Sequence, residues 1–317
     1  MKISSLCLAV LSFALIPAID ASALTIQYGT EKAQVGFMNQ TSNPNQEELH
    51  PWGPRSFRVH NGEFWVADSV GGRVLHLAAD GKLLHEVSVG TTSALIEDIA
   101  LKTDAAGAVE GVFVVRSDTQ EVVLLGLDGK RQMTFGSLGD EPGKFTQATF
   151  VECGKTGHVF VADVARETLD VFNPDGSFLR ELHWEWSGFA LDPAGNLARL
   201  KWDGEAKIGH LIIETPDGKQ VNDIGLQIED HTNPKLWWVG SKGESLVTYI
   251  PPAGFKGEYS WAICDTFGKP TSSGRVKPPV VMSRFLAQDL DATWYLVAAD
   301  FNEAPKGNVK IETYEFK

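Results

Sequence analysis

One short motif occurs twice in this sequence, and the repeat limits the folds that the chain can adopt. The string Val-Ala-Asp ends at Asp68 and again at Asp163, and an Asp-Gly pair follows each copy, at Gly81 and at Gly176. The two aspartates and the two glycines are both separated by 95 residues. A shared spacing between two separate landmarks indicates an internal repeat, so the fold must be one that is built from repeated units.

Turn signals divide the chain at regular intervals. Asp-Gly pairs, which are strong hairpin signals, begin at residues 80, 128, 175 and 217, and Phe267-Gly268 is a degenerate fifth copy. The glycines are spaced by 48, 47, 42 and 50 residues. Between the turns lie short runs rich in Val, Phe, Trp, Leu and Ile, which are typical of strands. A period near 47 residues is the size of one four-stranded blade of a β-propeller.

Six such blades fit the chain, which predicts an all-β fold: a six-bladed propeller of four-stranded antiparallel blades. The expected strands are 56–60, 63–68, 73–78 and 83–89 in the first blade, 96–102, 111–116, 121–127 and 131–135 in the second, and 147–152, 158–163, 168–173 and 178–183 in the third. The fourth and fifth blades are expected at about 186–226 and 235–276, and the sixth starts near residue 283 with only three strands. The N-terminal run 24–29 is predicted to supply its fourth strand, since closing the ring removes exposed sheet edges.

Two of these blades resemble the NHL repeat. The first carries Phe-Trp-Val-Ala-Asp-Ser at 64–69, Arg-Val at 73–74 and Asp-Gly-Lys at 80–82, and the third carries Val-Ala-Asp at 161–163 and Asp-Gly-Ser at 175–177. The likeness is close over these two blades, loose over the second and only topological over the last three. It implies a propeller of the class that includes secreted binding scaffolds and, in relatives, lactonases and other calcium-assisted hydrolases. The fold does not choose among those functions.

The first 23 residues are typical of a secretory signal peptide. Lys2 gives a positive start, an apolar run extends from Leu6 to Ile16, and the segment ends with Ala-Ser-Ala at 21–23. This arrangement predicts cleavage after Ala23, which leaves residues 24–317 as a single NHL-like propeller domain. We therefore expect a periplasmic or secreted protein, and the short signal favours the periplasm.

Charge and cysteine content narrow the class of partner. The net charge is −13 and no basic run is present, which argues against nucleic acid. No segment after the signal is apolar enough to insert into a membrane, and we expect a monomer. Two cysteines follow the signal, Cys153 and Cys264. They are either two buried thiols in different blades, which we favour, or a disulfide that closes a long loop.

The repeated aspartate is the first candidate site. Equivalent positions meet around one axis in a propeller, so Asp68, Asp163 and Asp300 would form a carboxylate ring suited to Ca²⁺. Arg116 takes the matching place in the second blade, where it would bind an anionic ligand or pair with the aspartates. The structural alternative, which we favour, is that the aspartates cap the turn after each second strand by accepting backbone N–H bonds.

Tryptophan supplies the second candidate site. Trp184 and Trp186 fall where one blade connects to the next, on a loop face where partners usually bind. Because no catalytic motif is present, we favour a non-enzymatic scaffold that needs no cofactor and binds a protein, peptide or glycan at one rim and the channel mouth. The alternative is a calcium-dependent, lactonase-like hydrolase with its metal in the channel.

Overall fold

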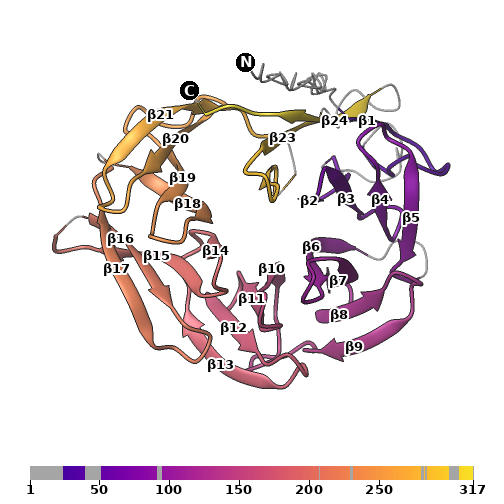
Figure 1. Cartoon of the computed structure of the whole chain (residues 1–317), viewed down its shortest axis with the longest axis horizontal. Helices are drawn as coiled ribbons and strands as arrows, with labels where there is room; N and C mark the ends of the chain where they lie inside the picture. Colours follow the sequence, from indigo (N-terminus) through magenta and orange to yellow (C-terminus); the bar gives the residue numbers. More distant parts are fainter. Residues whose placement is uncertain are drawn as a thin grey trace, which may run out of the picture.

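Six four-stranded sheets stand around a central axis and form a closed ring, as Figure 1 shows. The computed structural model describes residues 24–39, 51–90, 95–206, 208–228, 231–279, 282, 284–299 and 307–316. The expected signal peptide, residues 1–23, lies outside this range. No helix in the described ranges is long and apolar enough to cross a membrane. The predicted six-bladed, all-β propeller is confirmed.

Each blade is an antiparallel meander that runs from the channel outward, and the blades are numbered I to VI along the chain. Blade I contains β2 to β5 (Phe57–His60, Glu63–Asp68, Arg73–Leu77, Leu83–Ser88), and blade II contains β6 to β9 (Ile96–Thr103, Val109–Arg116, Glu121–Gly126, Arg131–Phe135). Blade III contains β10 to β13 (Ala148–Cys153, Val159–Asp163, Thr168–Phe172, Phe178–His183), and blade IV contains β14 to β17 (Phe189–Leu191, Leu197–Asp203, Ile208–Glu214, Gln220–Leu226). Blade V contains β18 to β21 (Thr232–Val239, Ser245–Ile250, Tyr259–Cys264, Pro270–Val276).

Blade VI joins the two ends of the chain. Its inner strands are β22 (Leu286–Gln288), β23 (Trp294–Ala299) and β24 (Asn308–Thr313), and β1 (Leu24–Gln27) pairs antiparallel with β24. Leu24 faces Ile311 and Ile26 faces Val309 in this register. The two strands run side by side at the top of Figure 1. The prediction that the N-terminal strand completes the last blade is therefore confirmed.

The Asp-Gly pairs form the turns between the third and fourth strands. Gly81 has a φ of +84° and Gly176 a φ of +82°, in the left-handed region that glycine adopts at little cost. In three of these turns the aspartate, Asp80, Asp128 or Asp175, accepts a hydrogen bond from the backbone amide two residues on, as in Asp80 Oδ1 with the Lys82 N–H at 3.0 Å. These turns lie at the opposite end of the ring from the connections between blades, because the strands of each blade alternate in direction.

Alternate residues of each strand pack against the two neighbouring blades. On β3, Phe64 and Val66 belong to the apolar cluster that blade I shares with blades V and VI, while Trp65 and Ala67 belong to the cluster shared with blade II. Blades II and III, III and IV, and IV and V share three further clusters. Both cysteines are free thiols, Cys153 in blade III and Cys264 buried in blade V. The two thiols lie in different blades, as we favoured, but Cys153 is only partly buried.

Candidate functional site

Four charged side chains meet where the inner strands surround the axis. Arg58 lies on β2, Asp98 on β6 and Glu152 on β10, and Arg284 lies two residues before β22. Arg284 Nη2 lies 3.0 Å from Asp98 Oδ2 and 2.9 Å from Glu152 Oε1, while Arg58 Nη2 lies 3.3 Å from Asp98 Oδ2. We call these four residues the central ion cluster. It links blades I, II, III and VI by charge-assisted hydrogen bonds.

The two carboxylates of the central ion cluster are held as counter-ions. Burial alone would raise the pKa of Asp98, but Arg284, Arg58 and the Val151 amide, which donates to Oδ2 at 3.0 Å, lower it to about 2. Burial and the nearby charge of Arg284 lower the pKa of Arg58, and its hydrogen bond to the Val151 carbonyl at 3.0 Å helps to hold it in place. Asp98 and Glu152 are thus already matched by two guanidinium groups.

Lys235, on β18, brings a further cation to the same region. Its Nζ lies 4.6 Å from the centre of the Phe150 ring and 4.4 Å from that of the Trp237 ring, within cation–π range. Burial and the positive charge of Arg284 lower the pKa of Lys235 to about 7, although Asp98 acts in the other direction. Lys235 therefore changes charge near neutral pH, where an ordinary lysine stays protonated.

A cavity of about 440 Å³ lies at one end of the channel, the end that carries the connections between successive blades. We call it the mouth pocket. Its aromatic walls and its two cationic groups are contributed by Trp186, Trp237, Tyr259, Phe285, Arg55 and Lys235. The Arg55 guanidinium lies 2.8 Å from Glu97 and 4.7 Å from the centre of the Trp52 ring. A concave site lined by aromatic, proline and polar side chains can take a small ligand or a side chain.

Trp186 is the most exposed aromatic side chain of the mouth pocket. It is 58% exposed and has a φ of +58°, and Asn233 on the same pocket has a φ of +48°. A left-handed backbone is uncommon for a bulky residue and costs about 1–2 kcal/mol. The local sequence holds this geometry, because Trp184 is buried and its indole donates to the Gly188 carbonyl at 3.2 Å. Trp184 anchors the connection, and Trp186 points out of it.

Each repeated aspartate binds backbone amides of the turn that follows it and of a segment earlier in the chain. Asp68 Oδ1 accepts from the Gly36 and Gly71 amides at 2.8 and 3.0 Å, and its Oδ2 accepts from Arg73 Nε at 2.9 Å. Asp163 accepts from four backbone amides, at residues 146, 147, 165 and 166. Both carboxylates are fully buried. The favoured turn-capping interpretation agrees with this geometry, which gives the aspartates a structural role.

The structure does not bring the other predicted residues together into one site. Arg116 forms a bidentate pair with Asp118 in its own hairpin, at 3.1 and 2.6 Å. Trp184 is 1% exposed and belongs to the apolar cluster between blades III and IV, and Asp300 lies outside the described residues. Among the predicted residues that the structure describes, Trp186 is the one found in the mouth pocket. Among the described residues, no group of three or more His, Cys, Asp or Glu side chains is placed to hold a metal ion.

The central ion cluster and Lys235 were not predicted from the sequence. The predicted carboxylate ring lies at the ends of the second strands, where the repeat is most visible, whereas these charges lie on or beside the inner strands. A signal was present: Arg58 lies between Phe57 and Val59, and Asp98 precedes Ile99, in short apolar strands. A charge inside a predicted inner strand of a propeller must face the channel or a neighbouring blade, so these positions deserve the same weight as the repeated motif.

Solved structures of similar shape are propellers of different functions. A gluconolactonase from Xanthomonas campestris has a TM-score of 0.52 and 13% identity, over 82% of this chain and 86% of that one. A streptogramin B lyase has a TM-score of 0.50 and 11% identity, over 82% of this chain and 93% of that one. No family model matches the sequence, and no curated protein matches it either. At these identities the likeness shows the six-bladed fold alone.

Proposed function

We propose that this protein is a non-enzymatic binding propeller that takes its ligand at the mouth pocket. The observation that carries the proposal is Trp186, a large aromatic side chain that is 58% exposed on a left-handed backbone. Neither core packing nor backbone preference accounts for such a residue. Strained positions of this kind cluster at ligand sites, where the surrounding structure holds them in place.

The lining of the mouth pocket indicates what the ligand must offer. Trp186, Trp237 and Tyr259 provide flat surfaces on which an apolar ring, a peptide group or a sugar face stacks. Lys235 and Arg55 favour a hydrogen-bond acceptor or an anionic group nearby. Because the pKa of Lys235 is about 7, an anionic ligand should bind more tightly as the pH falls through neutrality and the amine becomes protonated.

The central ion cluster supports a binding role over calcium-assisted hydrolysis. A calcium ion needs six to eight oxygen ligands, mostly from unpaired carboxylates and carbonyls. Asp98 and Glu152 are the two carboxylates of the cluster, and each lies within 3.5 Å of the guanidinium groups of both Arg58 and Arg284. Placing Ca²⁺ there would require it to displace two buried guanidinium groups.

Two further parts of the proposal rest on the sequence. Residues 1–23 have the composition of a signal peptide, which supports a periplasmic or secreted protein. The paired Val-Ala-Asp and Asp-Gly motifs of blades I and III support a place among NHL-repeat propellers. In that setting the mouth pocket would meet protein, peptide or glycan ligands outside the cytoplasm, with the protein acting as a monomer.

A thermal-shift screen against soluble glycans and short peptides tests the binding role. A ligand at 100 times its Kd adds about 2.7 kcal/mol, so a true ligand should raise the Tm of the parent by several degrees. The same ligand should have little effect on Trp186→Ala. Phe267→Ala is the matched control, because Phe267 is a 78% exposed aromatic on a turn at the opposite end of the ring. Equal stabilisation of all three proteins would place the ligand elsewhere and contradict the proposal.

The same assay separates the scaffold from the hydrolase. We expect the Tm in millimolar CaCl₂ and in EDTA to agree within about 1 °C. A large stabilisation by Ca²⁺ that EDTA reverses would instead favour the enzyme, since a metal that binds only the folded state raises its stability by mass action.

A further inference from the structure

Lys235 is held in the mouth pocket by the connection that carries Trp186. The amide of Leu236, the next residue of β18, donates to the Ser187 carbonyl at 2.7 Å. The stem of Lys235 packs against Gly188, where an added Cβ would lie 2.9 Å from Lys235 Cγ. Both contacts fix the lysine beside this connection, so its amine and the Trp186 indole line one cavity.

Aromatic rings surround the amine of Lys235. Its Nζ lies 4.6 Å from the centre of the Phe150 ring and 4.4 Å from that of the Trp237 ring. Trp237 is itself held in place, because its indole donates to the Thr248 hydroxyl at 2.8 Å and its ring meets that of Phe285 edge-on, with 4.7 Å between centres. This wall of the pocket is therefore preformed, and it solvates an ammonium group less well than water does.

The charged groups near Lys235 belong to the central ion cluster. Arg284 Cζ lies 5.8 Å from the centre of the same Phe150 ring, and burial together with the positive charge of Arg284 lowers the pKa of Lys235 to about 7, against the opposing effect of Asp98. Asp98 and Glu152 are already bound by guanidinium groups. An apolar setting and a neighbouring cation are two conditions that make a lysine amine nucleophilic at neutral pH.

We propose that Lys235 is a covalent binding residue whose amine forms a reversible Schiff base with a small aldehyde that carries an aromatic ring. The inference rests on the proposed binding role and names the class of ligand. The ring of the aldehyde stacks on the aromatic walls of the mouth pocket, which include Trp186 and Tyr259. Stacking holds the carbonyl carbon beside Nζ, so the two groups react within one complex.

Formation of the Schiff base needs no oxidant, reductant or further reactant. The lone pair of the neutral amine attacks the carbonyl carbon, a C–N bond forms, and one proton passes from nitrogen to the former carbonyl oxygen. The resulting carbinolamine loses its hydroxyl group together with the remaining proton of nitrogen as water, and the C=N bond forms. One amine and one aldehyde thus give one imine and one water. Hydrolysis reverses these steps and releases the ligand intact.

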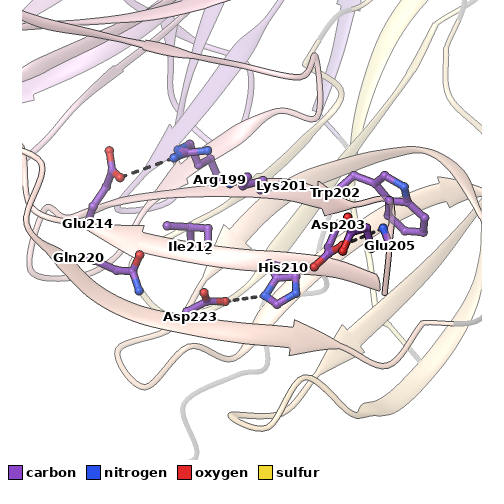
Figure 2. Close-up of a pocket in the computed structure, with 11 residues that line it drawn as sticks. Arg199, Lys201, Trp202, Asp203, Glu205, His210, Ile212, Glu214, Gln220 and Asp223 are labelled. Carbon is purple, nitrogen blue, oxygen red and sulfur yellow. Dashed lines mark hydrogen bonds and ion pairs between the residues drawn. The ribbon is translucent and has the colours of Figure 1, made fainter. Parts of the chain in front are cut away.

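A second lysine lies in the opposite setting, on the polar face that blade IV turns toward blade III. Leu200 and Leu211 pack in the apolar cluster shared with blade V, so Lys201 faces the other way. It lines a separate cavity of about 530 Å³, which Figure 2 shows. Four carboxylates line the same cavity, those of Asp203, Glu205, Glu214 and Asp223. Because Lys201 is exposed, and because water and carboxylates favour the charged form of an amine, we expect it to react slowly.

Reductive trapping with benzaldehyde tests the proposal. The full chain is incubated at pH 7 with benzaldehyde and sodium cyanoborohydride, which reduces an imine to a stable benzylamine, and peptide mapping by mass spectrometry locates the benzyl groups. We expect Lys235 to be labelled about tenfold faster than Lys201 or more, since about half of its amine is neutral at this pH. The ratio of the two rates should fall as the pH rises toward 10, where ordinary lysines also become neutral. The terminal α-amine, which titrates near pH 8, lies on a different peptide.

Three variants serve as comparisons. Lys235→Arg keeps a cation that cannot form an imine, and it should lower the early incorporation of benzyl groups, whereas Lys201→Arg should leave it unchanged. Trp186→Ala should slow the labelling of Lys235 several-fold, because the ring of the aldehyde loses a stacking surface. Phe267→Ala, at the opposite end of the ring, should not slow it.

The outcomes separate this inference from the binding role itself. Labelling of Lys235 no faster than that of Lys201 overturns the Schiff base, while a ligand whose stabilisation depends on Trp186 still supports the binding role. Fast labelling of Lys235 that Trp186→Ala leaves unchanged supports the reactive lysine and contradicts the part given to Trp186. The rates are measured in the parent protein, so they do not depend on the folding of a variant, and a Tm within a few degrees of the parent establishes that each variant is folded.

Discussion

At the scale of single residues, Trp186 combines an exposed indole with a backbone conformation that its side chain disfavours. Replacing it with glycine and with alanine separates the two properties. Both variants lose the indole, but only glycine adopts a φ near +58° without a steric cost. We expect Trp186→Gly to be about 1 kcal/mol more stable than Trp186→Ala in urea unfolding, and both to bind ligand equally poorly.

Equal stabilities of the two Trp186 variants would mean that the left-handed backbone is absent in solution. Asn233→Gly is a second comparison, because asparagine tolerates the same region better than most residues. The difference in stability between Asn233→Gly and Asn233→Ala should resemble the difference between the two Trp186 variants, since the steric cost of the left-handed backbone is the same in both cases.

The lowered pKa of Lys235 predicts that the stability of the protein depends on pH. Its pKa is about 7 in the folded protein and near 10.4 in an unfolded chain. Below pH 7 both states are protonated and the cost of burying the ammonium is fully present. Between pH 7 and about 10, Lys235 is protonated in the unfolded chain and neutral in the folded protein. The free energy of unfolding of the parent therefore rises with pH by about 1 kcal/mol per pH unit because of this group. Lys235→Met should lack that rise.

The Lys235 measurement is a difference between two urea titrations, at pH 7 and pH 9.5. Groups that titrate in both proteins, such as the tyrosines, cancel in the comparison. A parent and a variant with the same change in unfolding free energy would show that the lysine is solvated and has an ordinary pKa.

The residues of the candidate site were the least predictable part of the protein. Trp186 was visible in the sequence because it lies in a connection between blades, where binding residues are common. The central ion cluster was not, because residues 58, 98, 152 and 284 meet only once the ring is closed. No local pattern records which inner-strand charges from separate blades approach one another.

At the scale of elements, Asp98 joins β6 to the inner strands of three other blades. Asp98→Asn leaves Arg58 and Arg284 buried with Glu152 as the remaining carboxylate of the cluster, and breaking a buried pair costs about 3–5 kcal/mol. We expect a loss of this size in urea unfolding at pH 7. Since the pKa of Asp98 is about 2 in the folded state, its contribution should be present above pH 4 and fade as the pH falls toward 2.

Asp118→Asn is the matched control for Asp98→Asn. Asp118 also pairs with an arginine, but its side chain is 34% exposed, and surface pairs contribute about 0–1 kcal/mol. If the two variants lost the same small amount of stability, the central ion cluster would be no more than a surface pair. The double variant Asp98→Asn/Arg284→Met should recover part of the loss by removing one uncompensated charge.

The strands were predictable where turn chemistry and alternation agree. Asp-Gly pairs marked the outer hairpins, and the predicted strands of blades I to III match the observed strands to within two residues at every end. The inner strands of blades IV and VI, Phe189–Leu191 and Leu286–Gln288, are three residues long. Such short strands carry no periodic signal, so only the approximate span of those blades was predicted.

At the scale of the whole molecule, the ring depends on contact between its two ends. The 95-residue repeat predicted the blades, and the count of three strands in the last blade predicted the closure. The polar face that blade IV turns toward blade III was not predictable, because it arises from the polarity of alternate residues in one sheet whose apolar face packs against blade V. Closure sets the geometry of the channel, so any ligand site at its mouth depends on it.

Two neighbouring positions of β1, the strand that closes the ring, can receive the same substitution, one in the core and one facing solvent. Ile26 is 2% exposed, lies opposite Val309 and belongs to the cluster shared by blades V, VI and I, whereas the neighbouring Thr25 faces solvent. Ile26→Asp places a charge in that core, and we expect it to lower the free energy of unfolding by about 3 kcal/mol or more. Thr25→Asp introduces the same residue at an exposed position of the same strand and should lower the free energy of unfolding by less than about 1 kcal/mol.

Removing residues 24–29 should be at least as damaging as Ile26→Asp, because it exposes the edge of β24 and uncovers the apolar cluster. Circular dichroism with urea unfolding measures all three, and a truncated chain as stable as the parent would mean that the last blade is complete without the N-terminal strand.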